Sequence, residues 1–209
     1  MDIEHIAIVL GVILVSMTVH EAMHGYVAYW LGDDTAKAEG RLTLNPIKHI
    51  DPFLTILLPL ILALSGAPVF GGAKPVPFNP NRVKYGEWGA ALVALAGPLT
   101  NFMIAFVLFG LYILLGAPST GIVKSILVTG VGVNLGFFVF NMLPIPPLDG
   151  SRVLYALAPE FVRRIMEMIE QYGLIVIFAI VMLASPLIGT YMGGAINLIL
   201  QGFYAIFGG

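Results

Sequence analysis

The chain has 209 residues, of which 58% are hydrophobic and only 11% are charged, and its mean hydropathy is +0.94. This composition excludes an ordinary soluble domain and predicts a polytopic membrane protein whose surroundings are the lipid bilayer. The formal net charge of −2 provides no basic field, so we expect no nucleic-acid partner. The chain has no cysteine, so any metal must be held by histidine and carboxylate side chains.

The first apolar segment covers residues 6 to about 31, which is enough for a helix to span a hydrocarbon core of ~30 Å. The residues before it lack the basic region and the small-residue cleavage site of a signal peptide. We therefore expect the segment to stay in the mature protein as its first membrane helix.

The motif His20-Glu21-Ala22-Met23-His24 interrupts this apolar segment. In a helix, side chains four residues apart lie within about 40° of each other, so the two histidines can bind one metal ion. Glu21 beside them could then take a proton from a metal-activated water. Ionisable groups at membrane depth are costly, which indicates a function for this group rather than for the isolated His5 and His49. Two ligands are too few, so a third must come from elsewhere.

Three segments of different character follow the first helix. Residues 40–46 alternate apolar and polar side chains before a turn signal, as an edge strand does. Residues 53–70 form a second apolar run, interrupted by Pro59 and by a turn signal at residues 65–68. Residues 71–80 are too rich in proline and glycine for a helix, and we expect extended backbone there.

Two further membrane helices are predicted at residues 87–115 and 122–142. The first contains Ala96-Gly97-Pro98-Leu99-Thr100-Asn101, where glycine and proline would kink the helix or allow close packing. Asn101 could contact a neighbouring helix or a substrate, and we favour helix packing.

The C-terminal part is predicted to contain an amphipathic helix at the membrane interface, residues 151–169. An apolar helical hairpin is predicted at about residues 170–207, around the turn signals Ser185-Pro186 and Gly189. The predicted fold is therefore an all-α polytopic membrane protein with about 5–6 membrane helices. The whole chain, residues 1–209, is expected to form a single domain.

The distribution of basic residues predicts the orientation in the membrane. Most lysines and arginines fall in three segments, residues 37–48, 74–84 and 152–164. By the positive-inside rule, these three basic segments are cytoplasmic, whereas the N-terminus and the turn at residues 116–121 lie outside. Residues 53–70 then start and end on one side, which predicts a re-entrant hairpin. The histidine pair opens toward the cytoplasm. Nine of the ten lysines and arginines fall in these segments: Lys37, Arg41, Lys48, Lys74, Arg82, Lys84, Arg152, Arg163 and Arg164.

Asp149 is the candidate for the third metal ligand. It follows the proline-rich stretch of residues 144–147, and Gly150 after it leaves the backbone free to turn. The alternative is that Asp149 only caps the helix that follows, which is a common role for aspartate. Because its segment reaches the same side of the membrane as the histidine pair, we favour the ligand role.

Three motifs together resemble the site-2 protease family of intramembrane metalloproteases. They are the His-Glu-x-x-His motif at residues 20–24, the Ala-Gly-Pro motif at residues 96–101, and residues 141–150, which fit the pattern N-x-x-P-x-P-x-L-D-G. The motifs occur in the order found in the family, and the resemblance covers about residues 1–157, the expected catalytic core. The family's regulatory PDZ and CBS modules are not seen in this sequence.

The resemblance implies that His20, His24 and Asp149 bind one Zn²⁺ and that Glu21 is the catalytic base. It further implies a small membrane-associated β-structure formed by residues 71–80 and the predicted strand near Leu42. The substrates would be membrane-spanning proteins, cut within their helices in regulated intramembrane proteolysis.

An unwound substrate helix needs new hydrogen-bond partners, which an exposed edge strand can provide. We therefore expect substrate contacts at Leu42, Thr43, Leu44 and Val76, and from the Asn141 side chain near the zinc site.

A second hypothesis is a membrane transporter or channel for metal ions that uses the same histidine and aspartate ligands. It would require polar residues at successive depths on different helices, whereas this sequence concentrates them at one level. A third, an inactive scaffold, is disfavoured because the base and all three ligands are present.

Overall fold

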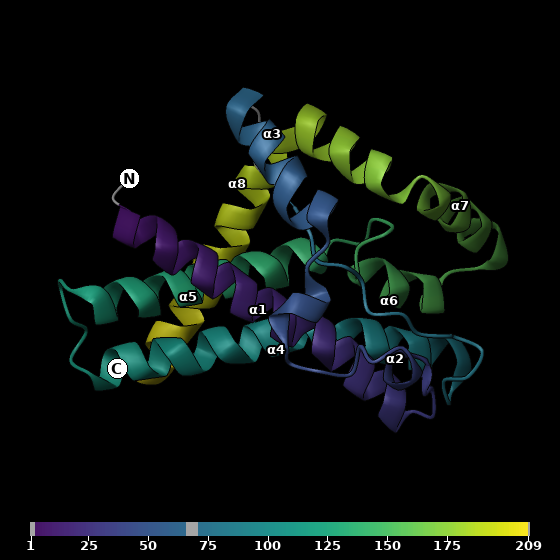
Figure 1. Ribbon diagram of the computed structural model, residues 1–209, viewed down its shortest axis with the longest axis horizontal. Coiled ribbons are helices and arrows are strands. Elements are labelled where there is room, and N and C mark those ends of the chain that lie inside the picture. Colours follow the sequence, from purple (N-terminus) through teal and green to yellow (C-terminus); the bar gives the residue numbers. More distant parts are fainter. Residues whose placement is uncertain (1–2, 66–70, 209) are drawn as a thin grey trace.

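The computed structural model describes residues 3–65 and 71–208, and within these residues the chain is helical without any β-strand (Figure 1). Four helices of the described part are long and apolar enough to cross a membrane. The sequence predicted about 5–6, and that number is not confirmed. The four helices are α1 (Ile3–Trp30), α4 (Gly86–Leu114), α5 (Ile122–Asn141) and α8 (Gly173–Phe207).

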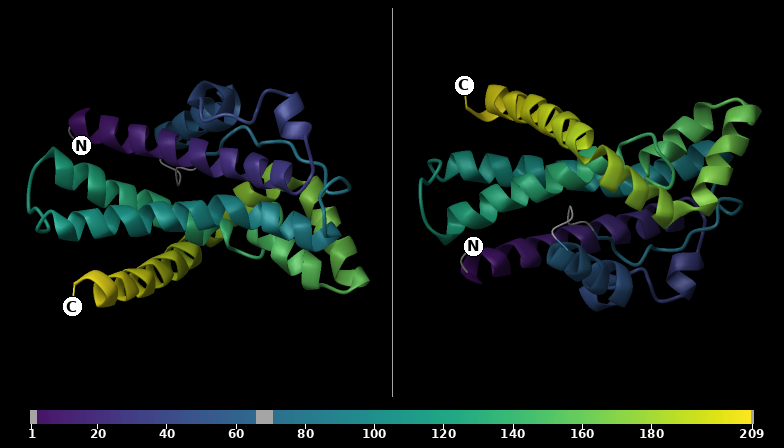
Figure 2. Two further views of the ribbon diagram at one scale, coloured as in Figure 1. Left: turned by 90° about the horizontal axis from the view of Figure 1, so that it is seen from below. Right: turned by 90° about the horizontal axis from the view of Figure 1, so that it is seen from above.

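Helices α1, α4 and α5 pack against one another and form the centre of the protein (Figures 1 and 2). The packed face of α4 carries small residues, including the buried Ala90, Ala94 and Gly97. Small side chains allow membrane helices to approach closely, because association there depends on van der Waals contact and hydrogen bonds.

Helix α8 consists of two helical parts joined at a kink, and its direction does not reverse, so the predicted C-terminal hairpin is wrong (Figure 2). The backbone leaves helical geometry at Ala184 (φ −116°, ψ 15°), two residues before Pro186, and then resumes the helix. A proline inside a helix removes one hydrogen bond and bends the axis, but a membrane helix tolerates it. The C-terminal half of α8 returns to α4 through aromatic contacts of Phe203 with Phe102, Phe106 and Phe109.

The apolar run after the first helix forms short helices, η2 (Pro52–Leu57) and α3 (Leu58–Ser65). The chain then returns to its starting point, because the Gly72 N–H donates to the Leu54 carbonyl at 3.1 Å. This return agrees with a hairpin that begins and ends in one place. Residues 66–70, which belong to the predicted hairpin, lie outside the described residues.

The predicted strands at residues 40–46 and 71–80 are absent from the described chain. Around the first, a short helix α2 (Thr35–Ala38) and a 3₁₀ helix η1 (Pro46–His49) flank a tight turn. In this turn the Arg41 N–H donates to the Ala36 carbonyl. The Arg41 N–H is therefore not available for a strand ladder. The second segment forms neither helix nor strand, and its prolines lack the N–H groups that a ladder needs.

The predicted amphipathic helix is divided into α6 (Gly150–Leu157) and α7 (Glu160–Gln171). The break falls at Ala158-Pro159, where proline cannot continue a helix. Arg163 crosses the break and donates to the carbonyls of Tyr155 and Ala156 at the end of α6.

The two ends of the helix bundle are built from different segments of the chain. The N-terminus, the loop between α4 and α5, and the C-terminus lie at one end, whereas α2, α6 and α7 lie at the other (Figure 2). We call the latter the basic end, since these helices and the loops beside them carry most of the lysines and arginines.

Candidate metal centre

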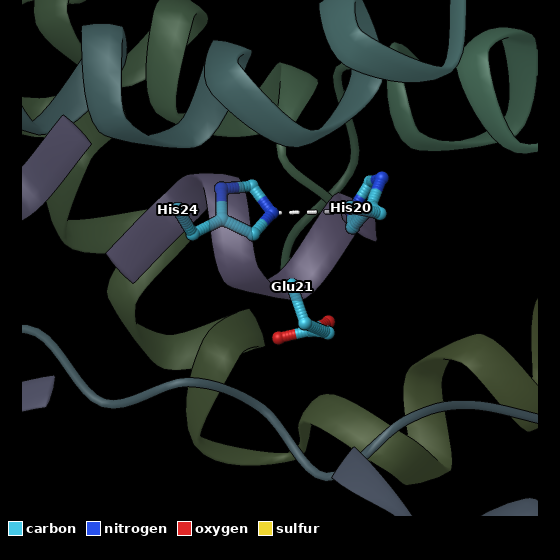
Figure 3. A group of neighbouring side chains, drawn as sticks. All are labelled: His20, Glu21 and His24. Atoms are coloured by element: carbon cyan, nitrogen blue, oxygen red, sulfur yellow. Dashed lines mark hydrogen bonds between the residues drawn. The ribbon is translucent and has the colours of Figure 1, made fainter. Parts of the chain in front are cut away.

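His20 and His24 lie one turn apart in the second half of α1, and their rings point the same way (Figure 3). Their Nε2 atoms are 3.1 Å apart, and both residues are buried, with exposed fractions of 7% and 9%. The helical spacing that the sequence predicted therefore brings the two imidazoles to a common point.

Asp149 faces this point from the loop before α6. Its Oδ2 lies 3.2 Å from His20 Nε2, and its Oδ1 lies 3.6 Å from His24 Nε2. Although Asp149 occupies the N-cap position of α6, its side chain makes no capping hydrogen bond, so the capping role is not observed.

The other nitrogen of each histidine ring is held by α4. His24 Nδ1 lies 2.8 Å from the Val93 carbonyl, and His20 Nδ1 lies 2.6 Å from Asn101 Oδ1. Because these oxygens only accept, both Nδ1 atoms donate, and in neutral imidazoles the Nε2 atoms are left with bare lone pairs. Two lone pairs and a carboxylate that converge on one point match the ligand set of a divalent cation.

Gly97 of α4 closes the site on the side opposite α1. A Cβ atom at this position would lie 2.5 Å from His24 Nε2 and 2.6 Å from His20 Nε2. Only glycine leaves this space open beside both ligand atoms. The residues present therefore fit a metal ion in donor chemistry and in the space provided.

Glu21 points away from the space between the two imidazoles (Figure 3). Its carboxylate still belongs to the same group, since one ligand atom each from His20, Glu21 and His24 lie within 4.8 Å of one another. Glu21 Oε2 accepts a hydrogen bond from the Val76 N–H at 2.9 Å. Asp149 stays the predicted third ligand, since its two carboxylate oxygens lie 3.2 Å and 3.6 Å from the Nε2 atoms.

A buried network of polar side chains behind His20 was not predicted from the sequence. Asn101 donates from Nδ2 to Asn134 Oδ1 at 2.8 Å, and Asn134 donates to Ser16 Oγ at 2.9 Å. All three residues are almost fully buried. Helix packing, the role favoured for Asn101, describes part of this arrangement, but its contact with a proposed metal ligand was missed. The sequence feature that could have indicated this network is the presence of Ser16, Asn101 and Asn134 in otherwise apolar helices.

The predicted substrate-binding residues have other contacts in the structure. Asn141 donates from its side chain to the Phe137 carbonyl in its own helix. Leu42, Thr43 and Leu44 form no strand, and the Val76 N–H is already bonded to Glu21. Substrate contacts of all five residues therefore stay predictions.

Comparison with known proteins decides the family. The chain matches "Peptidase family M50" over residues 8–119 and 116–184. The chain belongs to this family. It is the site-2 protease family that the three motifs resemble, so the predicted enzyme class, a metalloprotease, is confirmed. Together with the four apolar helices, this membership identifies an integral membrane protein.

Similar curated proteins cover most of this M50 chain. "Putative zinc metalloprotease YwhC" of Bacillus subtilis is 45% identical over 86% of this chain and 81% of its own length. "Putative zinc metalloprotease Rip2" of Mycolicibacterium smegmatis is 32% identical over 85% of this chain and 67% of its own length. The Rip2 protein of Mycobacterium tuberculosis is also 32% identical, over 88% of this chain and 69% of its own length. No solved structure matches significantly.

Proposed function

We propose that this protein is an intramembrane zinc endopeptidase that cleaves the membrane-spanning helices of other proteins. The observation that carries the proposal is the convergence of His20, His24 and Asp149 at one point inside a bundle of apolar helices. A water-dependent site at membrane depth suits a substrate that is itself embedded in the bilayer.

Zinc is the metal, and His20, His24 and Asp149 are its proposed ligands. The curated relatives are named as zinc metalloproteases, and a site with two imidazoles, one carboxylate and no thiolate has the composition of a catalytic zinc site. When bound, Zn²⁺ supplies a Lewis acid that acidifies a water molecule and polarises a carbonyl group.

Glu21 is the proposed general base. Its carboxylate takes a proton from the water as the water oxygen attacks the scissile carbonyl carbon. The protonated Glu21 then donates this proton to the amide nitrogen as the C–N bond breaks, so that a carboxylic acid and an amine are released. Attachment to the same helix turn as both histidines fixes the distance of Glu21 from the reaction.

The site is proposed to receive water from the cytoplasm. The metal centre lies in the half of α1 nearer the basic end, and the positive-inside rule assigns that end to the cytoplasm. The N-terminus, at the opposite end, would then lie outside the cytoplasm.

The decisive experiment compares wild type with Glu21→Gln in proteoliposomes that contain single-span fusion proteins as test substrates. We expect cleavage in wild type, no cleavage in Glu21→Gln, and equal zinc content in both. Glu4→Gln, at the exposed start of the same helix, is the matched control and should cleave normally. Full activity of Glu21→Gln would remove Glu21 from the mechanism, and metal transport without cleavage in wild type would replace a protease by a transporter.

A further inference from the structure

One backbone N–H group reaches the proposed catalytic base from a distant part of the sequence. Val76 lies between Pro75 and Pro77, which have no N–H, so it carries the only backbone donor of this tripeptide. That donor points at Glu21 Oε2, at an N···O distance of 2.9 Å, across 55 positions of sequence. The segment that the sequence predicted as an edge strand therefore has one of its backbone hydrogen bonds to the proposed catalytic base.

Val76 is fixed in place by its buried side chain. Its exposed fraction is 6%, and its Cγ1 lies 3.1 Å from the position that a Cβ of Gly25 would take. Leu42 contributes a second methyl group at 3.3 Å from the same position. Because Gly25 follows His24 directly, the absence of a side chain there provides the space for Val76 beside the proposed metal ligands.

Hydrogen bonds on both sides of Val76 hold the segment against the rest of the protein. The Lys74 N–H donates to the His49 carbonyl at 2.9 Å, and Arg41 Nη2 donates to the Lys74 carbonyl at 2.7 Å. After Val76, the Asn79 N–H donates to the buried Asp33 carboxylate. The adjacent prolines restrict φ further, so the Val76 N–H has little freedom to turn away from Glu21.

We propose that Val76 is a positioning residue for Glu21, acting through its backbone N–H. This inference rests on the proposed function. The bond occupies Oε2 and fixes the plane of the carboxylate, which leaves Oε1 to accept the proton from water. Preorganisation of a general base matters because proton transfer requires donor and acceptor within about 2.6–3.2 Å of each other. The contact acts on the reaction and not on substrate affinity.

The test removes this N–H while it keeps the side chain. Replacement of Val76 by its α-hydroxy acid analogue changes the amide to an ester and leaves the isopropyl group in place. The same ester at Ala73, whose N–H makes no hydrogen bond in the described structure, is the matched control. The substrate is a single-span fusion protein that wild type cleaves in proteoliposomes, and kcat, KM and zinc content are measured.

We expect the Val76 ester to lower kcat about 10- to 100-fold, the range for loss of a hydrogen bond to a charged group. KM and zinc content should stay at wild-type values. Val76→Ala, which keeps the N–H, should lose much less kcat than the ester, and the Ala73 ester should lose little.

Either of two results would overturn the inference. One is a Val76 ester with kcat within twofold of the Ala73 ester; the other is a raised KM at unchanged kcat, which indicates a substrate contact. Failure of the proposed function is distinguishable, because it appears as no cleavage by wild type.

Discussion

Asn101 and His20, which are 81 positions apart in the sequence, are joined by a hydrogen bond of 2.6 Å between Oδ1 and Nδ1. The amide group of Asn101 is itself oriented, because its Nδ2 donates to Asn134. Since Oδ1 can only accept, the bond places the proton of a neutral His20 on Nδ1 and leaves Nε2 free for the metal.

Substitution of Asn101 should therefore weaken zinc binding. We expect Asn101→Leu to raise the zinc Kd about 10- to 100-fold, the range found for loss of a partner behind a metal ligand. Asn101→Asp, which keeps an acceptor oxygen, should retain more affinity. Competition with a zinc chelator measures both variants. Equal Kd values for wild type and Asn101→Leu would show that the hydrogen bond does not orient the ligand.

Gly97→Ala should abolish zinc binding and cleavage. Its Cβ would lie 2.5–2.6 Å from both Nε2 atoms, so either the imidazoles or α4 must move. Gly136→Ala in α5 is the control, because a Cβ there has no atom within 4 Å. Metal analysis of both purified variants provides the measurement, and a Gly97→Ala protein with full zinc content and activity would contradict the packing argument.

Part of the metal centre could be predicted from the sequence, because helix periodicity and the side of the membrane on which a segment lies can both be read from it. The histidine pair follows from helix periodicity, and the proximity of Asp149 was inferred from its side of the membrane; both agree with the observed geometry. The contact between Asn101 and His20 depends on the relative register of two helices, which no spacing within one segment reveals.

The wrong predictions arose from turn signals that the structure overrides. Ser185-Pro186 and Gly189 suggested a hairpin, but α8 continues through them because a membrane helix can absorb a proline as a kink. The proline-rich segment near Val76 contains no helix, as its composition predicted. Its assignment to β-structure failed because extended prolines lack the donors for a ladder, and its one central donor has a partner in Glu21.

Asp33 should make stability depend on pH in the acid range. Burial raises the pKa of this carboxyl group, but hydrogen bonds from Thr35 and Asn79 and the charge of Arg82 lower it below its ordinary value. A lowered pKa means that the stabilisation is complete above the unfolded value of about 3.9 and is lost as the pH falls through the folded value. Asp33→Asn should lose about 1–3 kcal/mol at pH 7.

Thermal unfolding of the purified protein from pH 7 to pH 3 tests this expectation. The difference in stability between wild type and Asp33→Asn should shrink toward the acid end, because protonation of Asp33 removes the same charge. Asp34→Asn is the neighbouring control: its exposed ion pair with Arg82 should contribute less than about 1 kcal/mol. A difference in stability between wild type and Asp33→Asn that stays constant at all pH values would show that the effect depends on the shape of the side chain and not on its charge.

The orientation in the membrane can be tested because the natural chain has no cysteine. Glu39→Cys places one thiol at the basic end, and Ser119→Cys places one at the opposite end; both positions are exposed. If the basic end faces the cytoplasm, a membrane-impermeant maleimide added to intact cells should label Ser119→Cys alone, and lysis should expose Glu39→Cys. Labelling of Glu39→Cys in intact cells would reverse the orientation and place the metal centre nearer the external side.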